Sequence, residues 1–139
     1  MAIFYETLGI SFPNIKRRET THWIKRVVES NKKTLGDITY IFCSDDEILR
    51  INRMYLNHDY YTDIITFDYS EGDELSGDMF ISLETVTTNL EEFKTKYEDE
   101  LRRVMIHGIL HLCGYDDETT TEKSDMRIKE DEALRLYED

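Results

Sequence analysis

The sequence of 139 residues contains little cysteine, a single proline and no long apolar run. Its two cysteines, Cys43 and Cys113, are too few for a disulfide framework and form no CxxC pair, so we expect buried, reduced thiols. No stretch is long enough to span a bilayer. The N-terminus lacks the basic start and the cleavage site of a signal peptide. We therefore expect a cytoplasmic protein with no membrane partner.

Basic residues are also scarce. The chain has 17 Lys and Arg against 30 Asp and Glu, which gives a formal net charge of -13. Such a charge repels phosphate and disfavours loose, sequence-independent binding to nucleic acid. A specific active site for RNA would need a local basic cluster. Clusters occur at 14–18 and 31–33, although both are typical of solvated surface.

The length predicts one domain, spanning residues 1–139. Alternating or β-branched runs predict strands at 3–7, 37–44, 62–70 and 77–83, with a hairpin loop at 71–76. Helical spacing of apolar residues predicts helices at 19–33, 44–57, 84–96, 98–114 and 121–137. This mixture indicates an α+β fold, in which a small mixed sheet of about four strands packs with helices.

The helix predicted at 44–57 has two local signals. Ser44 and Glu47 have the spacing of a capping box at its start. Four apolar residues at helical spacing predict its buried stripe: Ile48, Ile51, Met54 and Tyr55.

The stretch "HGILHLCGYDD", residues 107–117, places two histidines four residues apart in an apolar run. On a helix these positions differ by only about 40° in azimuth, so His107 and His111 can meet one metal ion. Gly114 can end the helix in a left-handed conformation and turn the chain back. Asp117 then stands where a third ligand is needed, with Asp116 as a rival. Cys113 faces away and is not counted as a ligand.

This spacing is typical of a metallopeptidase in all but one respect. Those enzymes place a glutamate directly after the first histidine as the general base. Here that position is Gly108, which has no side chain. A site that acidifies bound water without such a base is compatible with phosphodiester hydrolysis.

These residues resemble the YbeY family of endoribonucleases and rRNA maturation factors. The resemblance covers roughly the C-terminal two-thirds of the chain and includes four segments: "MYLNHDYYTDIITFD", "SGDMFIS", "HGILHLCGYDD" and "EKSDMRIKEDE". It implies a single-domain α+β fold with one zinc ion at the end of the motif helix. By this resemblance His107 and His111 are zinc ligands, and Asp117 replaces the family's third histidine.

The resemblance also implies a function and partners for the protein. It implies cytoplasmic action on ribosomal RNA, notably maturation of the 16S rRNA 3′ end and ribosome quality control. The implied partners are the small ribosomal subunit and its assembly proteins, while the oligomeric state is left open. The Thr62–Asp63 and Gly77–Asp78 pairs match family residues and are interpreted as structural rather than catalytic.

The chain departs from the family at two positions. A carboxylate at Asp117 can bind zinc, but it makes the bound water less acidic than three histidines would. Two histidines and a carboxylate also resemble the iron facial triad, so another divalent metal is an alternative. Leu56 stands where the family has an arginine that would clamp phosphate. Arg53 and His58 are the nearby substitutes, and we take His58 as the candidate catalytic residue, as a proton donor or phosphate contact.

Two other functions compete with a nuclease. One is a different metallohydrolase, such as a peptidase, that uses the same metal-bound water. The other is a ribosome-assembly factor whose metal is structural. A closed site with four ligands would favour the latter, and an open position would favour an enzyme.

Overall fold

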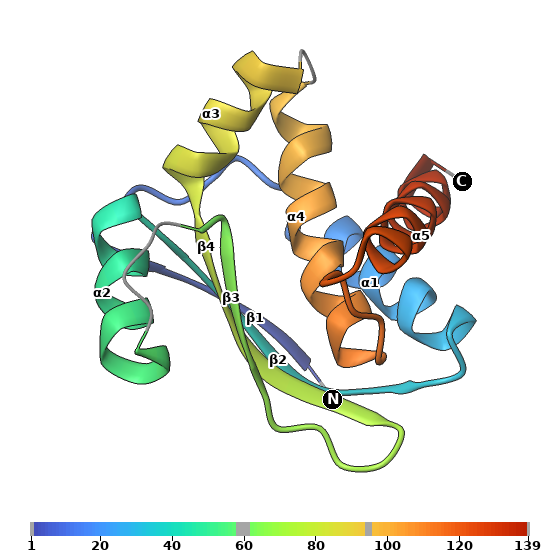
Figure 1. Cartoon of the computed structure of the whole chain (residues 1–139). Coiled ribbons are helices and arrows are strands. Elements are labelled where there is room, and N and C mark those ends of the chain that lie inside the picture. The colour runs from blue at the N-terminus through green and yellow to red at the C-terminus, as the bar shows by residue number, and fades with distance from the viewer. Residues whose placement is uncertain (1, 58–61, 94–95, 139) are drawn as a thin grey trace.

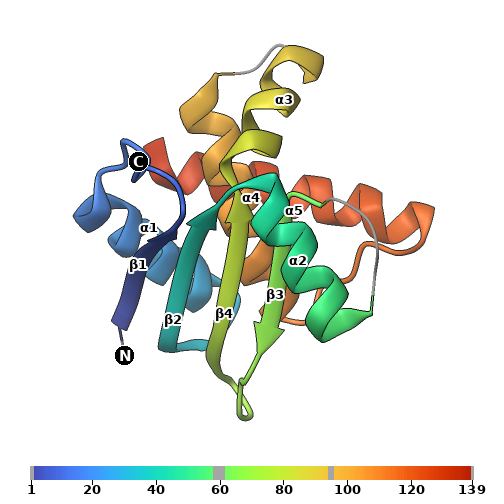
Figure 2. The same cartoon turned by 90° about the vertical axis from the view of Figure 1, so that its left-hand side faces the viewer.

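A mixed β-sheet lies between helices on both of its faces (Figures 1 and 2). The structure is a computed structural model that describes residues 2–57, 62–93 and 96–138. In this part of the chain there are four strands and five helices, which run in the order β1 (Ala2–Leu8), α1 (Arg17–Ser30), β2 (Thr34–Cys43), α2 (Asp45–Leu56), β3 (Ile64–Asp68), β4 (Glu74–Ser82), α3 (Leu83–Phe93), α4 (Tyr97–Leu112) and α5 (Thr120–Glu138). The predicted α+β class is confirmed. None of the described helices has both the length and the hydropathy to cross a bilayer.

The strand order in the sheet is β1-β2-β4-β3. β1, β2 and β4 are parallel, and β3 pairs with β4 in antiparallel orientation at one edge. Side chains alternate between the two faces of a strand. The fully buried Ile38, Tyr40 and Phe42 of β2 therefore point to the same face, where the Tyr40 hydroxyl donates to the Met105 carbonyl of α4 at 2.9 Å.

The larger hydrophobic core lies on this face, between the sheet, α1 and α4. α5 packs on the outer side of α4 and α1, where Trp23 Nε1 donates to the Ala133 carbonyl at 2.7 Å (Figure 1). α2 covers the opposite face over a smaller cluster formed by Cys43, Ile48, Ile51 and Ile65. α4 is thus enclosed by the sheet on one side and by helices on the other.

Two details differ from the sequence expectations. The long loop expected at 71–76 is a tight turn, because Glu71 and Glu74 exchange backbone hydrogen bonds and Gly72 takes a φ of 58°. Met54 and Tyr55 were expected in the buried stripe of α2, yet their exposed fractions are 59% and 64%. Figure 2 shows the reason: α2 crosses the sheet obliquely, so its last turn reaches the edge strand β3 and has no further strand beneath it.

Gly108 lets α4 approach the sheet closely. A Cβ atom at this position would lie 2.5 Å from Met79 Sδ and 2.9 Å from Ile64 Cδ1. Atoms at such distances overlap, so a side chain here would require Met79 and Ile64, or α4 itself, to shift. The contacts of Met79 and Ile64 therefore favour glycine over the glutamate of a metallopeptidase at this position.

We expect Gly108→Ala to lower the free energy of unfolding by up to about 2 kcal/mol. Overpacking costs about 1–3 kcal/mol, and the better helix propensity of alanine offsets only about 1 kcal/mol of that. Urea denaturation measures the change. Met79→Val removes the sulfur that a new methyl group would meet, so Gly108→Ala should cost less in that background. An equal cost in both backgrounds would contradict the close contact.

Candidate metal centre

The last two turns of α4 carry both histidines on one side of the helix. The centroids of the His107 and His111 rings lie 4.6 Å apart, and their Nε2 atoms lie 3.0 Å apart. Both side chains are only partly exposed, at 20% and 28%. The helical spacing read from the sequence thus brings two ligand nitrogens to a single point.

Gly114 ends α4 and reverses the chain. Its φ of 107° is in the region that favours glycine. The Gly114 N–H donates to the His111 carbonyl at 3.0 Å, and the Tyr115 N–H donates to the Leu110 carbonyl at 3.1 Å. This pair of bonds is a Schellman motif, which satisfies carbonyls at the end of the helix. The bend returns the next residues toward the histidines.

The loop that follows is also fixed at its far end. Thr119 Oγ1 accepts from the Glu122 N–H at 3.1 Å, and Glu122 Oε1 accepts from the Thr119 N–H at 3.0 Å. This capping box starts α5 and satisfies two backbone donors reciprocally. The short loop that holds Asp117 is therefore anchored on both sides by hydrogen bonds.

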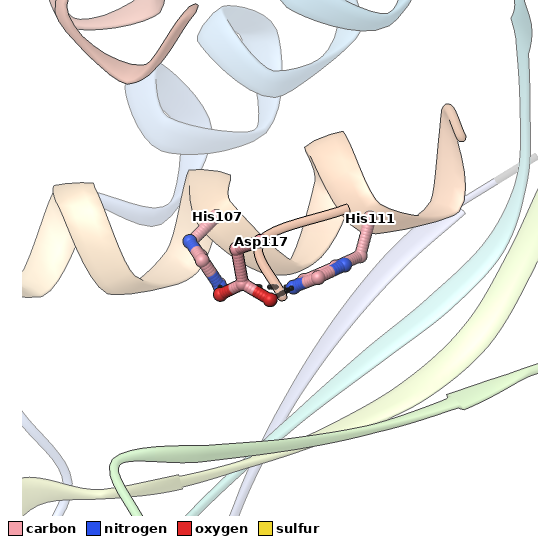
Figure 3. Close-up of side chains that lie close together, drawn as sticks. All are labelled: His107, His111 and Asp117. Atoms are coloured by element: carbon pink, nitrogen blue, oxygen red, sulfur yellow. Dashed lines mark hydrogen bonds and ion pairs between the residues drawn. The ribbon is translucent and has the colours of Figure 1, made fainter. Parts of the chain in front are cut away.

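Asp117 completes a cluster of three side chains (Figure 3). Its Oδ2 lies 3.3 Å from His107 Nε2, and its Oδ1 lies 3.5 Å from His111 Nε2. One ligand atom from each residue falls within a group whose members are at most 4.8 Å apart. Asp116, the rival ligand, is exposed and does not belong to the cluster.

The donor atoms of this cluster suit a metal ion. Two imidazole nitrogens and one carboxylate oxygen are common ligands of divalent transition metals. Two unprotonated Nε2 atoms at 3.0 Å would repel each other, and a cation near both would relieve the repulsion. His107, His111 and Asp117 could therefore hold a metal ion together.

A second contact of His107 lies on its other ring nitrogen. His107 Nδ1 is 2.6 Å from Glu130 Oε2 of α5. The other oxygen of Glu130 accepts from Arg103 Nη1 at 2.9 Å, and Arg103 Nη2 donates to Asp131 at 2.7 Å. Sequence reasoning missed Glu130 and Arg103. Arg103 is one turn before His107, but no periodicity pairs Glu130 with a residue 23 positions earlier.

These charges change the acidity of the groups around the cluster. Burial lowers the pKa of His107, but the hydrogen bond and charge of Glu130 outweigh it, with help from Asp117 and Asp63, so the pKa is raised above its usual 6.5. Burial raises the pKa of Asp63, and the nearby His107 only partly offsets this effect. In the metal-free protein the cluster therefore favours a proton on His107.

The cluster lies in the wall of a cleft of about 550 Å³. Four of the described lining residues are acids, and none is a lysine or an arginine. The described lining consists of Asn52, Leu56, Thr62, Asp63, Ile64, Ile65, Thr66, Asp68, His107, His111, Leu112, Asp117 and Glu118. Leu56 thus lies in the cleft wall, whereas Arg53 is not among the lining residues. His58, the candidate catalytic residue, lies outside the described residues.

The two residue pairs that match the family, Thr62–Asp63 and Gly77–Asp78, lie at different distances from the cluster. Thr62 and Asp63 line the cleft, where Asp63 faces the charge of His107. Gly77 lies in β4, and a Cβ there would clash with the Phe67 carbonyl of β3. The contact between β3 and β4 thus explains Gly77 by packing, whereas Thr62 and Asp63 lie beside the cluster.

Comparison with known proteins gives one consistent family. The family model described as "Endoribonuclease YbeY" matches residues 10–138. A protein of that name from Bacteroides fragilis is 61% identical over 136 residues, which cover 98% of each chain. One from Bacteroides thetaiotaomicron is 60% identical over 136 residues, 98% of this chain and 99% of the relative. The solution structure of TM1509 from Thermotoga maritima superposes with a TM-score of 0.69 at 27% identity, covering 98% of this chain and 89% of that chain.

The bend at Gly114 can be tested against a matched glycine. Gly114 and Gly72 both have positive φ, and a Cβ at either position would meet nothing within 4 Å. Alanine at each therefore costs backbone strain alone, about 1–2 kcal/mol in urea denaturation. Only Gly114→Ala should weaken binding of Zn²⁺, measured by competition with a chromophoric chelator, because only that strain displaces Asp117. Equal Zn²⁺ affinity in the two variants would refute this role of the bend.

The raised pKa of His107 predicts a pH dependence of stability in the metal-free protein. A proton that binds the folded state more tightly stabilises it fully below the unfolded pKa, about 6.5. This contribution is lost as pH rises through the higher folded pKa. The difference in unfolding free energy between wild type and His107→Asn, measured in chelator, should therefore decrease with rising pH above about 6.5. A difference that does not change with pH would contradict the raised pKa.

Proposed function

The chain belongs to the YbeY family of endoribonucleases, and from this membership we propose that it is a metal-dependent endoribonuclease that processes ribosomal RNA. In this proposal His107, His111 and Asp117 hold one zinc ion. The substrate is RNA of the small ribosomal subunit in the cytoplasm, and the roles are maturation of the 16S rRNA 3′ end and ribosome quality control. The observation that carries the proposal is the convergence of three ligand atoms in the wall of an open cleft.

The composition of the cleft supports dependence on a metal. A bound zinc ion would supply a Lewis acid that acidifies water and offsets negative charge on a phosphodiester. The described lining residues offer no lysine or arginine for that purpose, and they add the charges of Asp63, Asp68, Asp117 and Glu118. In this proposal the described residues of the lining hold the cation and shape the cleft, and none of them is a lysine or arginine that would neutralise phosphate.

We propose His58 as the proton donor or phosphate contact. The family arginine that would contact phosphate is absent, and Leu56 in its place lines the cleft. Thr62 lines the cleft as well. Described residues on both sides of position 58 thus line the cleft, which supports the proposal for His58.

Two observations favour this function over the alternatives. A peptidase of the matching motif needs a glutamate at position 108, where this chain has glycine and where any side chain would force Met79 and Ile64 to shift. A structural metal is usually enclosed by four protein ligands. Within the described residues the cluster contains three, His107, His111 and Asp117, and it borders the cleft.

The charge of the chain supports delivery to RNA by a partner. A net charge of -13 disfavours the unassisted approach of a polyanion. We propose that assembly proteins on the small ribosomal subunit position the cleft on its RNA. The cleft then has to fit only one site on the RNA, and the protein does not need an extended RNA-binding surface.

Incubation with two substrates tests the proposed chemistry. The purified protein is mixed with structured ribosomal RNA and with a peptide library, each with Zn²⁺ and with chelator. We expect cleavage of the RNA alone, and only with the metal, because the described lining of the cleft includes neither lysine nor arginine. Cleavage of peptides would instead support the metallopeptidase alternative, and cleavage of neither would support the assembly factor.

Neighbouring aspartates provide the matched control for the ligand set. Loss of a residue that only supports a ligand typically weakens metal binding about 10- to 100-fold. Asp117→Asn removes a proposed ligand, so it should weaken Zn²⁺ binding by more than this and should abolish RNA cleavage. Asp116→Asn changes the same charge one residue away and should leave both unchanged. Loss of Zn²⁺ binding in Asp116→Asn alone would assign the third ligand to Asp116.

A further inference from the structure

We propose that Glu130 is a positioning residue that fixes the tautomer and the orientation of His107. In this role it keeps the proton of the neutral ring on Nδ1 and leaves Nε2 free to bind a metal ion. The inference rests on the metal site proposed above, but it does not depend on RNA as the substrate. Neither the histidine motif nor the family match assigns this role to Glu130.

The hydrogen bond between the two side chains determines the tautomer. Glu130 Oε2 lies 2.6 Å from His107 Nδ1. An ionised carboxylate has no proton to donate, so Nδ1 must be the donor. A neutral imidazole carries one ring proton, and therefore Nε2 carries a lone pair. That atom faces His111 Nε2 at 3.0 Å and Asp117 Oδ2 at 3.3 Å.

Arg103 supplies a counter-ion to the carboxylate of Glu130. The Glu130 side chain is only 8% exposed, and a buried carboxylate needs a partner to keep its charge. Arg103 Nη1 donates to Glu130 Oε1 at 2.9 Å, so the two oxygens of Glu130 have different partners. A guanidinium is always charged, which makes Arg103 a permanent counter-ion.

A purely structural role for Glu130 does not account for this arrangement. Asp131, the next residue of α5, also accepts from Arg103, at 2.7 Å, so α4 and α5 are linked without Glu130. The second oxygen of Glu130 is directed at the imidazole instead. A carboxylate behind a ligating histidine commonly fixes the ring and raises its basicity as a ligand. The geometry therefore assigns Glu130 to His107 and Asp131 to the link between the helices.

Glu130→Gln tests the tautomer directly, because the amide has one accepting and one donating end. Arg103 can only donate, so the amide oxygen should face Arg103 and the NH₂ group should face His107 Nδ1. Nδ1 must then accept, and the ring proton moves to Nε2, the atom that should bind the metal. We expect the ¹⁵N chemical shifts of His107, measured without metal at a pH where the ring is neutral, to report an Nδ1–H tautomer in wild type and an Nε2–H tautomer in Glu130→Gln.

Zn²⁺ affinity, measured by competition with a chromophoric chelator, is the second readout. We expect Glu130→Gln to lose about 10- to 100-fold in affinity, the usual range for a residue behind a ligand. Asp131→Asn is the matched control, because it removes the other ion pair of Arg103 and leaves the bond from Glu130 to His107. It should keep both the wild-type tautomer and the wild-type affinity. Far-UV circular dichroism checks that each variant is folded.

The outcomes separate this role from the proposed function. An unchanged tautomer in Glu130→Gln, or an equal loss of affinity in Asp131→Asn, would overturn the positioning role. If Zn²⁺ fails to bind wild type, the metal site is wrong, and the inference about Zn²⁺ falls with it. If Zn²⁺ binds and the tautomer changes as expected, but no RNA is cleaved, the positioning role holds and only the nuclease function fails.

Discussion

The contact between α4 and the sheet at Gly108 fixes the position of the whole site. Because Met79 and Ile64 touch the helix where a Cβ would stand, α4 lies closer to β3 and β4 than a larger residue would allow. α5 covers the other side of α4, so the rotation of this helix about its axis is determined by packing on both sides. His107 and His111 consequently reach the cleft, and the apolar residues between them reach the core.

The position of Asp117 depends on a different kind of constraint. Asp117 lies in no helix or strand, and a loop of this kind would ordinarily be less precise than a regular element. The Schellman motif at Gly114 and the capping box between Thr119 and Glu122 tie the loop to α4 and α5 by backbone hydrogen bonds. Hydrogen bonds to the two flanking helices thus hold both ends of the loop that carries Asp117.

Charge gives the cleft its chemical character. The acids around the cluster make the site attractive to a cation and unattractive to a bare phosphate. Arg103 is the exception, but it is 16% exposed and is committed to Glu130 and Asp131 on the inner side of His107. The positive charge of Arg103 therefore reaches the cluster only through Glu130, behind His107, and the described lining of the cleft adds no lysine or arginine.

The sequence by itself determined several features that arise from neighbours in the chain. The spacing of His107 and His111 places both rings on one side of any helix, and the conformational freedom of Gly114 permits the bend that returns Asp117. The β-branched and aromatic run at 37–44 marked the strand that became β2. These signals are local, so they can be read without knowing how the elements pack.

Only the tertiary structure decided which distant side chains meet. Glu130 could be assigned to His107 only after α5 was placed on α4, and Met54 and Tyr55 are exposed only because α2 ends over the edge of the sheet. The close contact at Gly108 of α4 likewise depends on Met79 of β4. Periodicity shows that a helix has an apolar side, but the element that covers each turn is set by the packing of the whole chain.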